Sequence, residues 1–181
     1  MRNGTKIGGL GLAALLWFVN AVPATAAGRI EGFAGYYVAE ELEEDISYGV
    51  RGTWESERGW GLMLSYESFE TDGSGYGEPR NVDGKLEHLE LSFVSRLGGG
   101  GFEIFSGIGT TDVNVDTHVP GASVDLDKSS FSIHAGLAYR LDLGDVLYLR
   151  PEARARLYKV GDETIDYTGS IALGFRWGSG R

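Results

Sequence analysis

The stretch "DYTGSIALGFRWG", residues 166–178, decides the fold class because its apolar side chains recur at every second position. One parity carries Tyr167, Gly169, Ile171, Leu173, Phe175 and Trp177. The other parity carries Asp166, Thr168, Ser170, Ala172, Gly174 and Arg176. Since side chains alternate between the two faces of a strand, the pattern predicts a β-strand with one apolar and one polar face.

The same period of two recurs upstream and predicts seven more strands. Five of them alternate cleanly, over residues 46–55, 60–67, 88–93, 130–141 and 147–157. Two are blurred by aromatic residues, over 29–38 and 102–113. In the second of these we expect a β-bulge, because one extra residue would bring Phe105 and Val113 onto the apolar face. The count is eight strands, with no helical segment between them.

The links between these strands alternate between short and long. Short links occupy residues 56–59, 98–100 and 143–145. Links that are mostly longer and more polar are expected over residues 39–45, 71–84, 114–127 and 160–164. An even number of strands, with short turns at one end and long loops at the other, is typical of bacterial outer-membrane barrels. The sequence therefore predicts an all-β, eight-stranded, antiparallel up-and-down transmembrane β-barrel.

Aromatic residues indicate which face of the strands meets lipid. On the apolar face of the last strand, Tyr167 and Trp177 are ten residues apart, or about 25 Å along the normal in a tilted barrel. Tyr48 and Trp54 bracket an earlier strand in the same way. Because amphipathic rings favour membrane interfaces, we predict that the apolar face points outward to lipid. A secreted, lipocalin-like barrel with its polar face outside is the alternative.

The polar face fits a narrow, enclosed interior. It combines Gly, Ala and Ser with seven basic residues, Arg51, Arg96, Arg140, Arg150, Arg154, Arg156 and Arg176. Seven acidic residues oppose them, Glu31, Glu55, Glu67, Glu90, Glu103, Glu152 and Asp166. Charges removed from water cost several kcal/mol each unless they are paired. This balanced set predicts a salt-bridged network inside the barrel.

The N-terminus has the features of an export signal. Arg2 and Lys6 precede an apolar run over residues 7–19, and the small residues "ATA" follow it. A basic start, a short apolar core and a small-residue cleavage site together predict a signal peptide over residues 1–26 that is removed on export. An outer-membrane β-barrel domain over residues 27–181 then remains.

Composition excludes several kinds of site. The chain has no cysteine, which rules out disulfides, thiolate metal sites and a lipoprotein anchor. Its formal net charge is −10, from 26 acidic and 16 basic residues. An acidic balance of this kind offers no surface for nucleic acid. We expect neither a nucleic-acid partner nor a cofactor.

Across the mature chain, the sequence resembles the small outer-membrane β-barrels of the OmpA/OmpX type. The resemblance is carried by "GFAGYYV" (32–38), "FEIFSGIG" (102–109), "YLRPEARARLY" (148–158) and "YTGSIALGFRW" (167–177). It implies periplasmic termini and insertion by the outer-membrane assembly machinery through the last strand. The chain departs from the family pattern at "GSGR", which follows the final aromatic residue, and at Pro151, where we expect a local bulge.

The segment "RPEARAR", residues 150–156, is open to two interpretations. Arg150, Glu152, Arg154 and Arg156 share one strand face, so they would line an anion-selective pore or form half of a salt-bridged plug. Because eight strands enclose a space that side chains can fill, we favour the plug.

Ser132 and His134 are the one candidate catalytic pair, with Glu90 as an orienting carboxylate. A general base must lie within about 3 Å of the hydroxyl and face the substrate. A lipid A substrate would approach from the membrane, whereas both residues belong to the predicted interior face. We therefore predict a structural role for the pair and no catalytic residue.

The sequence also offers no convincing metal site. His88, His118 and His134 lack the spacing of zinc ligands, and His118 falls in a predicted loop. The acidic residues of segment 40–45 could hold a divalent cation loosely against lipopolysaccharide phosphates. A solvated acidic loop explains them equally well, so we predict no metal ligand.

Together these features predict a non-enzymatic barrel in the outer membrane of a Gram-negative bacterium. Its acidic outer loops would serve membrane integrity or surface interaction. The expected partners are outer-membrane lipids, lipopolysaccharide and the assembly machinery, and the expected state is a monomer. A narrow porin-like channel or small-molecule transporter is the alternative function, and a lipid A-modifying enzyme is the third.

Overall fold

The computed structural model describes residues 27–39, 45–74, 81–119, 122–160 and 162–178. The predicted signal peptide, residues 1–26, lies outside the described residues, as does most of the acidic segment 40–45. Among the described residues, no helix has the length and apolar character needed to cross a membrane.

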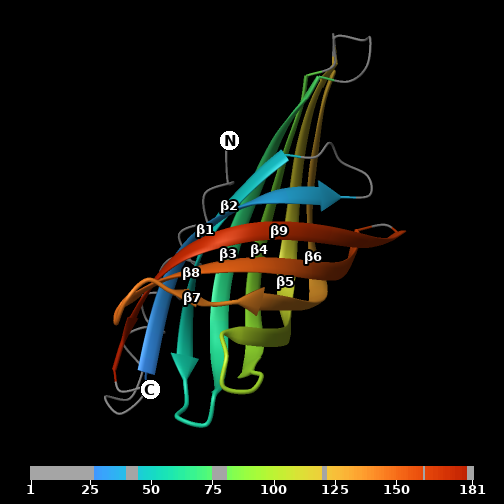
Figure 1. Cartoon of the computed structure of the whole chain (residues 1–181). Helices are drawn as coiled ribbons and strands as arrows, with labels where there is room; N and C mark the ends of the chain where they lie inside the picture. Colours follow the sequence, from blue (N-terminus) through green and yellow to red (C-terminus); the bar gives the residue numbers. More distant parts are fainter. Residues whose placement is uncertain (1–26, 40–44, 75–80, 120–121, 161, 179–181) are drawn as a thin grey trace.

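Eight long strands and one two-residue strand form a single closed sheet (Figure 1). The strands are β1 (Ala27–Ala39), β2 (Asp45–Glu55), β3 (Trp60–Ser74), β4 (Asn81–Arg96), β5 (Phe102–Val119), β6 (Ala122–Tyr139), β7 (Leu141–Asp142), β8 (Leu147–Val160) and β9 (Asp162–Trp177). All pairings are antiparallel, and the β1–β9 and β6–β8 pairings close the barrel. The predicted eight-stranded up-and-down barrel is confirmed, with β7 continuing β6 after a short break.

That break accommodates Pro151 without a bulge. The ladder between β6 and β8 ends at Ala138 and resumes in β7 at Leu141. The same register would place Tyr139 opposite Pro151, where no pairing forms. On its other side, Pro151 stays in register with Ile171 of β9. Because proline has no N–H to donate, the ladder is interrupted where that donor is missing, and the bulge that we expected there is wrong.

The apolar parity of the strands faces outward, as predicted. Large apolar side chains that are exposed on the outer wall include Ile46, Ile108, Phe131, Ile171 and Leu173. The opposite parity is buried, including every charged residue of the column in β8. Polar residues thus fill the interior and apolar residues cover the outside, which is the reverse of a water-soluble barrel.

The aromatic residues that blur the two irregular strands lie inside the barrel. β5 keeps a continuous register with both β4 and β6, so the bulge expected in residues 102–113 is absent and that prediction is wrong. Phe33, Tyr37, Phe105 and Val113 are buried. The narrow interior takes apolar side chains as well as charged ones, because it must be filled without voids.

Four strands continue beyond the predicted loop boundaries. β3 and β4 extend through most of segment 71–84, and β5 and β6 extend through most of segment 114–127, so both long loops were predicted wrongly. We call the parts of β3 to β6 over residues 68–74, 81–87, 112–119 and 122–129 the protruding sheet. Figure 1 shows it rising beyond the neighbouring strands. Strands outside a membrane need no alternating apolar face, so the pattern could not reveal them.

Within the described ranges, the protruding sheet has two edges without a neighbouring strand. The β2–β3 ladder ends at Ser47 and Phe69, and the β6–β8 ladder begins at Ser132. Just above that point, Ser130 Oγ donates to the carbonyl of Lys159 at 2.7 Å and accepts from its N–H at 3.2 Å. One serine side chain thus takes the place of the next ladder hydrogen bonds.

The register fixes the tilt of the strands. Paired residues lead from Gly35 across β2, β3, β4 and β5 to Lys128 on β6. In the other direction, they lead from Gly35 across β9 and β8 to Ala138, which is ten residues further along β6. A shear of ten in an eight-stranded barrel corresponds to a tilt of about 40°. Each residue then rises about 2.5 Å along the barrel axis, and each strand crossed from β1 toward β6 adds about 3 Å.

Glycines on the interior face make room for aromatic rings. A Cβ atom on Gly136 would lie 2.3 Å from Phe105 Cζ, and a Cβ atom on Gly174 would lie 2.2 Å from Tyr148 Cζ. Gly49 has the same relation to Phe33, also at 2.3 Å. The rings thus lie flat against the backbone of neighbouring strands, which explains part of the high glycine content.

This packing makes Gly136 a sensitive position. We expect Gly136→Val to destabilise the barrel by about 1–3 kcal/mol, because the added methyl groups overpack against Phe105. Gly169→Ala is the matched control, since a Cβ atom there meets nothing within 4 Å. Urea titration of the protein folded in lipid vesicles, followed by heat-modifiable gel mobility, measures the difference. Equal stability of the two variants would contradict this account of the glycines.

Candidate functional site

The interior of the barrel is the candidate site, because it gathers nearly all of the buried charge. At the end with the short turns, Arg29 Nη1 lies 2.7 Å from Glu103 Oε1. Arg96 pairs with Glu55, and Arg140 Nη1 lies 3.6 Å from Glu55 and 3.7 Å from Glu103. Three arginines therefore share two carboxylates. These five residues come from β1, β2, β4, β5 and the break between β6 and β7.

The middle of the interior centres on Glu152. Its carboxylate pairs with Arg51 and Arg150, and Arg154 Nη2 lies 2.7 Å from Glu152 Oε1. Arg51 also pairs with Glu31 from β1. A single carboxylate on β8 thus holds three guanidinium groups, two of them from its own strand.

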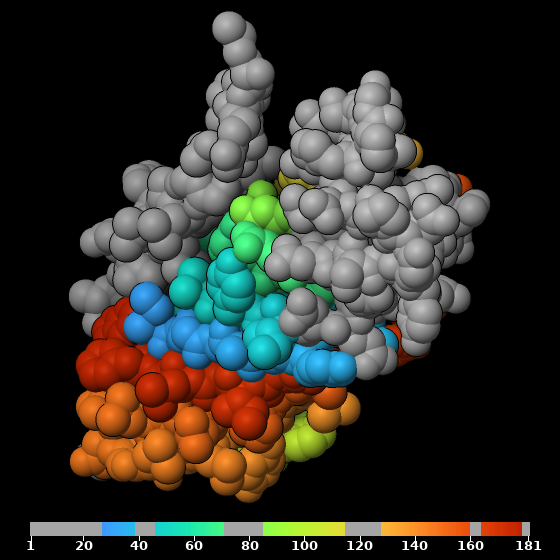
Figure 2. Space-filling model, turned by 90° about the horizontal axis from the view of Figure 1, so that it is seen from above, coloured from blue at the N-terminus to red at the C-terminus, as the bar shows by residue number. Residues whose placement is uncertain are grey.

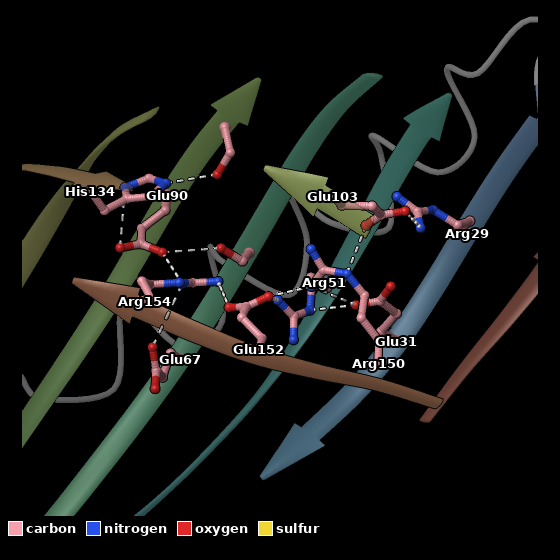
Figure 3. Close-up of polar contacts among 12 residues, drawn as sticks. Arg29, Glu31, Arg51, Glu67, Glu90, Glu103, His134, Arg150, Glu152 and Arg154 are labelled. Atoms are coloured by element: carbon pink, nitrogen blue, oxygen red, sulfur yellow. Dashed lines mark hydrogen bonds and ion pairs between the residues drawn. The ribbon is translucent and has the colours of Figure 1, made fainter. Parts of the chain in front are cut away.

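The network continues toward the loop end of the barrel. Arg154 pairs with Glu90, and Arg156 places Nε 2.6 Å from Glu90 Oε1 and Nη2 2.7 Å from Glu67 Oε2. At the other side, Arg150 Nε reaches Glu103 Oε2 at 2.9 Å. Figure 3 shows the resulting unbroken row of alternating charges, from Arg29 to Glu67.

Apolar groups fill the space around this row. The guanidinium of Arg51 lies 4.3 Å from the centroid of the Phe33 ring, and that of Arg154 lies 5.2 Å from the Phe105 ring. Toward the loop end, a cluster of buried side chains crosses the interior, Tyr37, Phe69, Leu86, Val113 and Tyr158. The described interior is therefore occupied by side chains over its whole length.

The candidate catalytic pair, Ser132 and His134, is not joined by a hydrogen bond in the structure. His134 Nε2 lies 2.7 Å from Ser92 Oγ, and its Nδ1 lies 3.4 Å from Glu90 Oε1 without hydrogen-bond alignment. Ser132 Oγ has no hydrogen-bond partner among the described residues. The structure thus brings Ser92, not Ser132, to the histidine.

This serine, histidine and glutamate set has the contacts of a buried polar network. Glu90 is engaged by Arg154 and Arg156, so it does not serve the histidine alone. Ser92 is fully buried and His134 is 5% exposed, which leaves no path for a lipid from the outer wall. The arrangement serves to satisfy buried polar groups.

Other predicted residues fall in varied places. Arg176 lies at the turn end rather than in the interior, where it pairs with Asp142 and donates to the carbonyls of Gly144 and Asp145. His88 is buried at 2.9 Å from Thr111 Oγ1, and no group of three potential metal ligands occurs among the described residues. His118 belongs to β5, so its placement in a loop was wrong.

Arg29 is the interior residue that the sequence pattern missed. It is buried and pairs with Glu103 and Glu55. Its position at the start of a strand made it look like a residue of the barrel rim. Its parity could have revealed it, because Arg29 lies on the same strand face as Glu31 and on the opposite face from Ile30.

Aromatic residues mark both ends of the outer wall. Tryptophans lie at the turn end, where Trp54 and Trp60 pack edge to face at 5.1 Å and Trp177 stacks on Phe175. Four tyrosines lie at the loop end, Tyr36, Tyr48, Tyr66 and Tyr167, whereas Tyr139 lies with the tryptophans at the turn end. Viewed from above, the wall formed by β1, β9 and β8 is continuous (Figure 2). Such aromatic girdles flank the apolar band of membrane barrels.

Solved structures reproduce this arrangement of strands. Ail from Yersinia pestis superposes with a TM-score of 0.63 at 17% identity, covering 86% of this chain and 100% of that chain. A major outer membrane protein from Thermus thermophilus gives 0.61 at 11% identity, covering 84% and 99%. The outer membrane protein OprG from Pseudomonas aeruginosa gives 0.52 at 13% identity, covering 87% and 99%.

This is the fold of a small outer-membrane barrel. The predicted likeness to barrels of the OmpA/OmpX type is confirmed at the level of the fold. The sequence matches no family model and no curated protein. The fold therefore rests on structure, because the shared pattern is one of alternation and not of particular residues.

Glu152 is the residue whose loss should harm this interior most. Replacing Glu152 with Gln leaves Arg51, Arg150 and Arg154 without their shared counter-charge. We expect a loss of about 3–5 kcal/mol of stability, because an uncompensated buried charge is that costly. Urea unfolding in lipid vesicles measures the loss. The control is Glu57→Gln in the exposed β2–β3 turn, and an equally small effect at both positions would refute the role given to Glu152.

Proposed function

We propose that the protein is an integral outer-membrane barrel without enzymatic activity that anchors an acidic sheet at the cell surface. The protruding sheet on a filled barrel carries this proposal. The exposed apolar wall between two aromatic girdles supports a position in the membrane. The protein then serves membrane integrity or surface interaction, not transport.

The charged interior supports a barrel that is closed to ions. Continuous Arg–Glu pairing from Arg29 to Glu67 leaves side chains, not solvent, along the axis. Moving an ion past these pairs would require several buried charges to separate together, each at a cost of several kcal/mol. An anion-selective pore lined by the β8 column is therefore the weaker interpretation.

The charge of the chain is concentrated at the loop end. Residues 40–45, 68–87, 112–129 and 159–164 contain sixteen acidic and four basic side chains, a formal charge of −12. The register also places Asp72, Asp83, Asp116 and Asp125 in one row across the protruding sheet. Interaction with a cationic partner is the form of surface contact that this charge favours.

The acidic loop end distinguishes this chain from Ail in the charge of the ligand that it would bind. Ail has been crystallised with sucrose octasulfate, a heparin analogue, which is a polyanion. The loop end of the present chain is itself strongly acidic, so repulsion disfavours such a ligand here. We propose that the two proteins share a scaffold and differ in the sign of the charge that they recognise.

The remaining parts of the proposal concern how the protein reaches its site. Residues 1–26 serve as a signal peptide that is removed, and residues 27–181 form the mature barrel. The assembly machinery inserts the barrel, with lipopolysaccharide and other outer-membrane lipids around it. The barrel functions as a monomer, because its ladders close within one chain.

Conductance tests the closed interior. In a planar lipid bilayer, the purified folded protein should give no large, stable openings, because the ion pairs and the apolar cluster fill the axis. A general porin reconstituted in the same bilayer serves as the positive control. Reproducible steady openings from the purified barrel would overturn the plug and establish the channel alternative.

Charge substitutions test the surface role. We expect Asp83→Asn combined with Asp116→Asn to weaken binding of polylysine to the protein in phosphatidylcholine nanodiscs by about five-fold, at ~0.5 kcal/mol per charge removed. Glu57→Gln combined with Asp145→Asn removes the same charge at the turn end and should change binding little. Equal weakening by both variants would show that net charge matters and the protruding sheet does not.

A further inference from the structure

The apolar band on the outer wall has unequal height around the barrel. On β9, apolar residues or glycine occupy every outward position from Ile165 to Trp177, a rise of about 30 Å at a tilt near 40°. On β3, the outward apolar residues run only from Trp60 to Tyr66, a rise of about 15 Å. Outer-membrane barrels present a band about 25 Å tall, so β3 falls well short of it.

Polar side chains end the band early on the short side. Ser68 and Glu87 face each other across β3 and β4, directly above Tyr66. Tyr66 donates its hydroxyl hydrogen bond to Glu87, and Lys85 Nζ lies 3.2 Å from Glu87 Oε1. Tyr66, Glu87 and Lys85 thus form one polar set, which belongs with lipid headgroups rather than with acyl chains.

The opposite side stays apolar at the same height. The register and the tilt place Ile165 of β9 level with Glu70 of β3, because each lies about 6–7 Å above Tyr36. Ile165 is 43% exposed, and the side chain of Glu70 is 58% exposed. One height on the barrel therefore carries an exposed alkyl group on one side and an exposed carboxylate on the other.

A rigid tilt of the barrel cannot remove the difference in band height between β3 and β9. Tilting raises one side and lowers the other, but it changes the height of neither apolar band. A bilayer meets a short apolar band by becoming thinner beside it, at a modest cost per ångström. We propose that the barrel thins the bilayer on one side, along β3 and β4, so that headgroups reach Glu70 at the height where acyl chains reach Ile165 on β9.

This inference rests on the proposed position of the barrel in a membrane, and its test separates the two. The chain has no cysteine, so single cysteines can carry nitroxide labels. The variants are Glu70→Cys and Glu57→Cys on the short side, Ile165→Cys on the tall side, and Leu173→Cys in the middle of the band. Collision rates with oxygen and with a water-soluble nickel chelate, in dioleoyl phosphatidylcholine vesicles, report the depth of each label.

With one-sided thinning, the labels at Glu70 and Glu57 both report headgroups or water, whereas those at Ile165 and Leu173 report hydrocarbon. Equal depth at Glu70 and Ile165 would overturn the inference. Hydrocarbon at Glu57 with water at Glu70 would also overturn it, in favour of a tilted barrel in a flat bilayer. Water at Leu173 would instead overturn the membrane position itself.

Bilayer thickness provides a second readout that needs no label. Glu70→Leu places an apolar side chain on β3 at the height of Ile165, where the exposed carboxylate now lies. We expect the folded yield in dioleoyl relative to dilauroyl phosphatidylcholine vesicles to rise at least two-fold. Lys159→Leu at the loop end of β8 is the control and should leave the ratio unchanged. An equal ratio for all three proteins would contradict the inference.

Discussion

Buried guanidinium and carboxylate groups can remain ionised in this barrel only if each has a counter-charge within reach, and this constraint organises the molecule. The outer wall is apolar, so the interior is where the strands place their polar face. Glu152 and Glu90 each bind more than one arginine, which lets six strands contribute to one network. Because the network spans the barrel, stability and the proposed closure to ions depend on the same side chains.

Alternation of polar and apolar residues reveals the strands of this barrel within the membrane but not their extensions beyond it. Alternation located all eight long strands and the direction in which their side chains point, because a membrane imposes opposite chemistry on the two faces. It failed for Phe105 and Val113, since an interior of mixed chemistry accepts apolar side chains. It failed again above Ser68 and Asp112, where both faces of a strand are polar and the ladder hydrogen bonds alone maintain the sheet.

The candidate site was predicted less completely than the fold, for a reason of geometry. The charged column of β8 was evident from sequence, but its partners on five other strands are set by shear, which sequence spacing does not contain. For that reason Ser92 was not foreseen as the partner of His134. Arg29 was missed because a strand end gives too few neighbours to establish a parity.

The position of the described tryptophans at one end of the outer wall has a consequence for how folding can be observed. The three described tryptophans all lie at the turn end, which in the proposed orientation remains on the side from which the barrel enters the bilayer. Tyr36, Tyr48, Tyr66 and Tyr167 must then travel across to the far leaflet together with the acidic hairpins. Indole fluorescence therefore reports arrival at the near leaflet, and a blue-shifted emission spectrum can develop before the hairpins have completed their translocation.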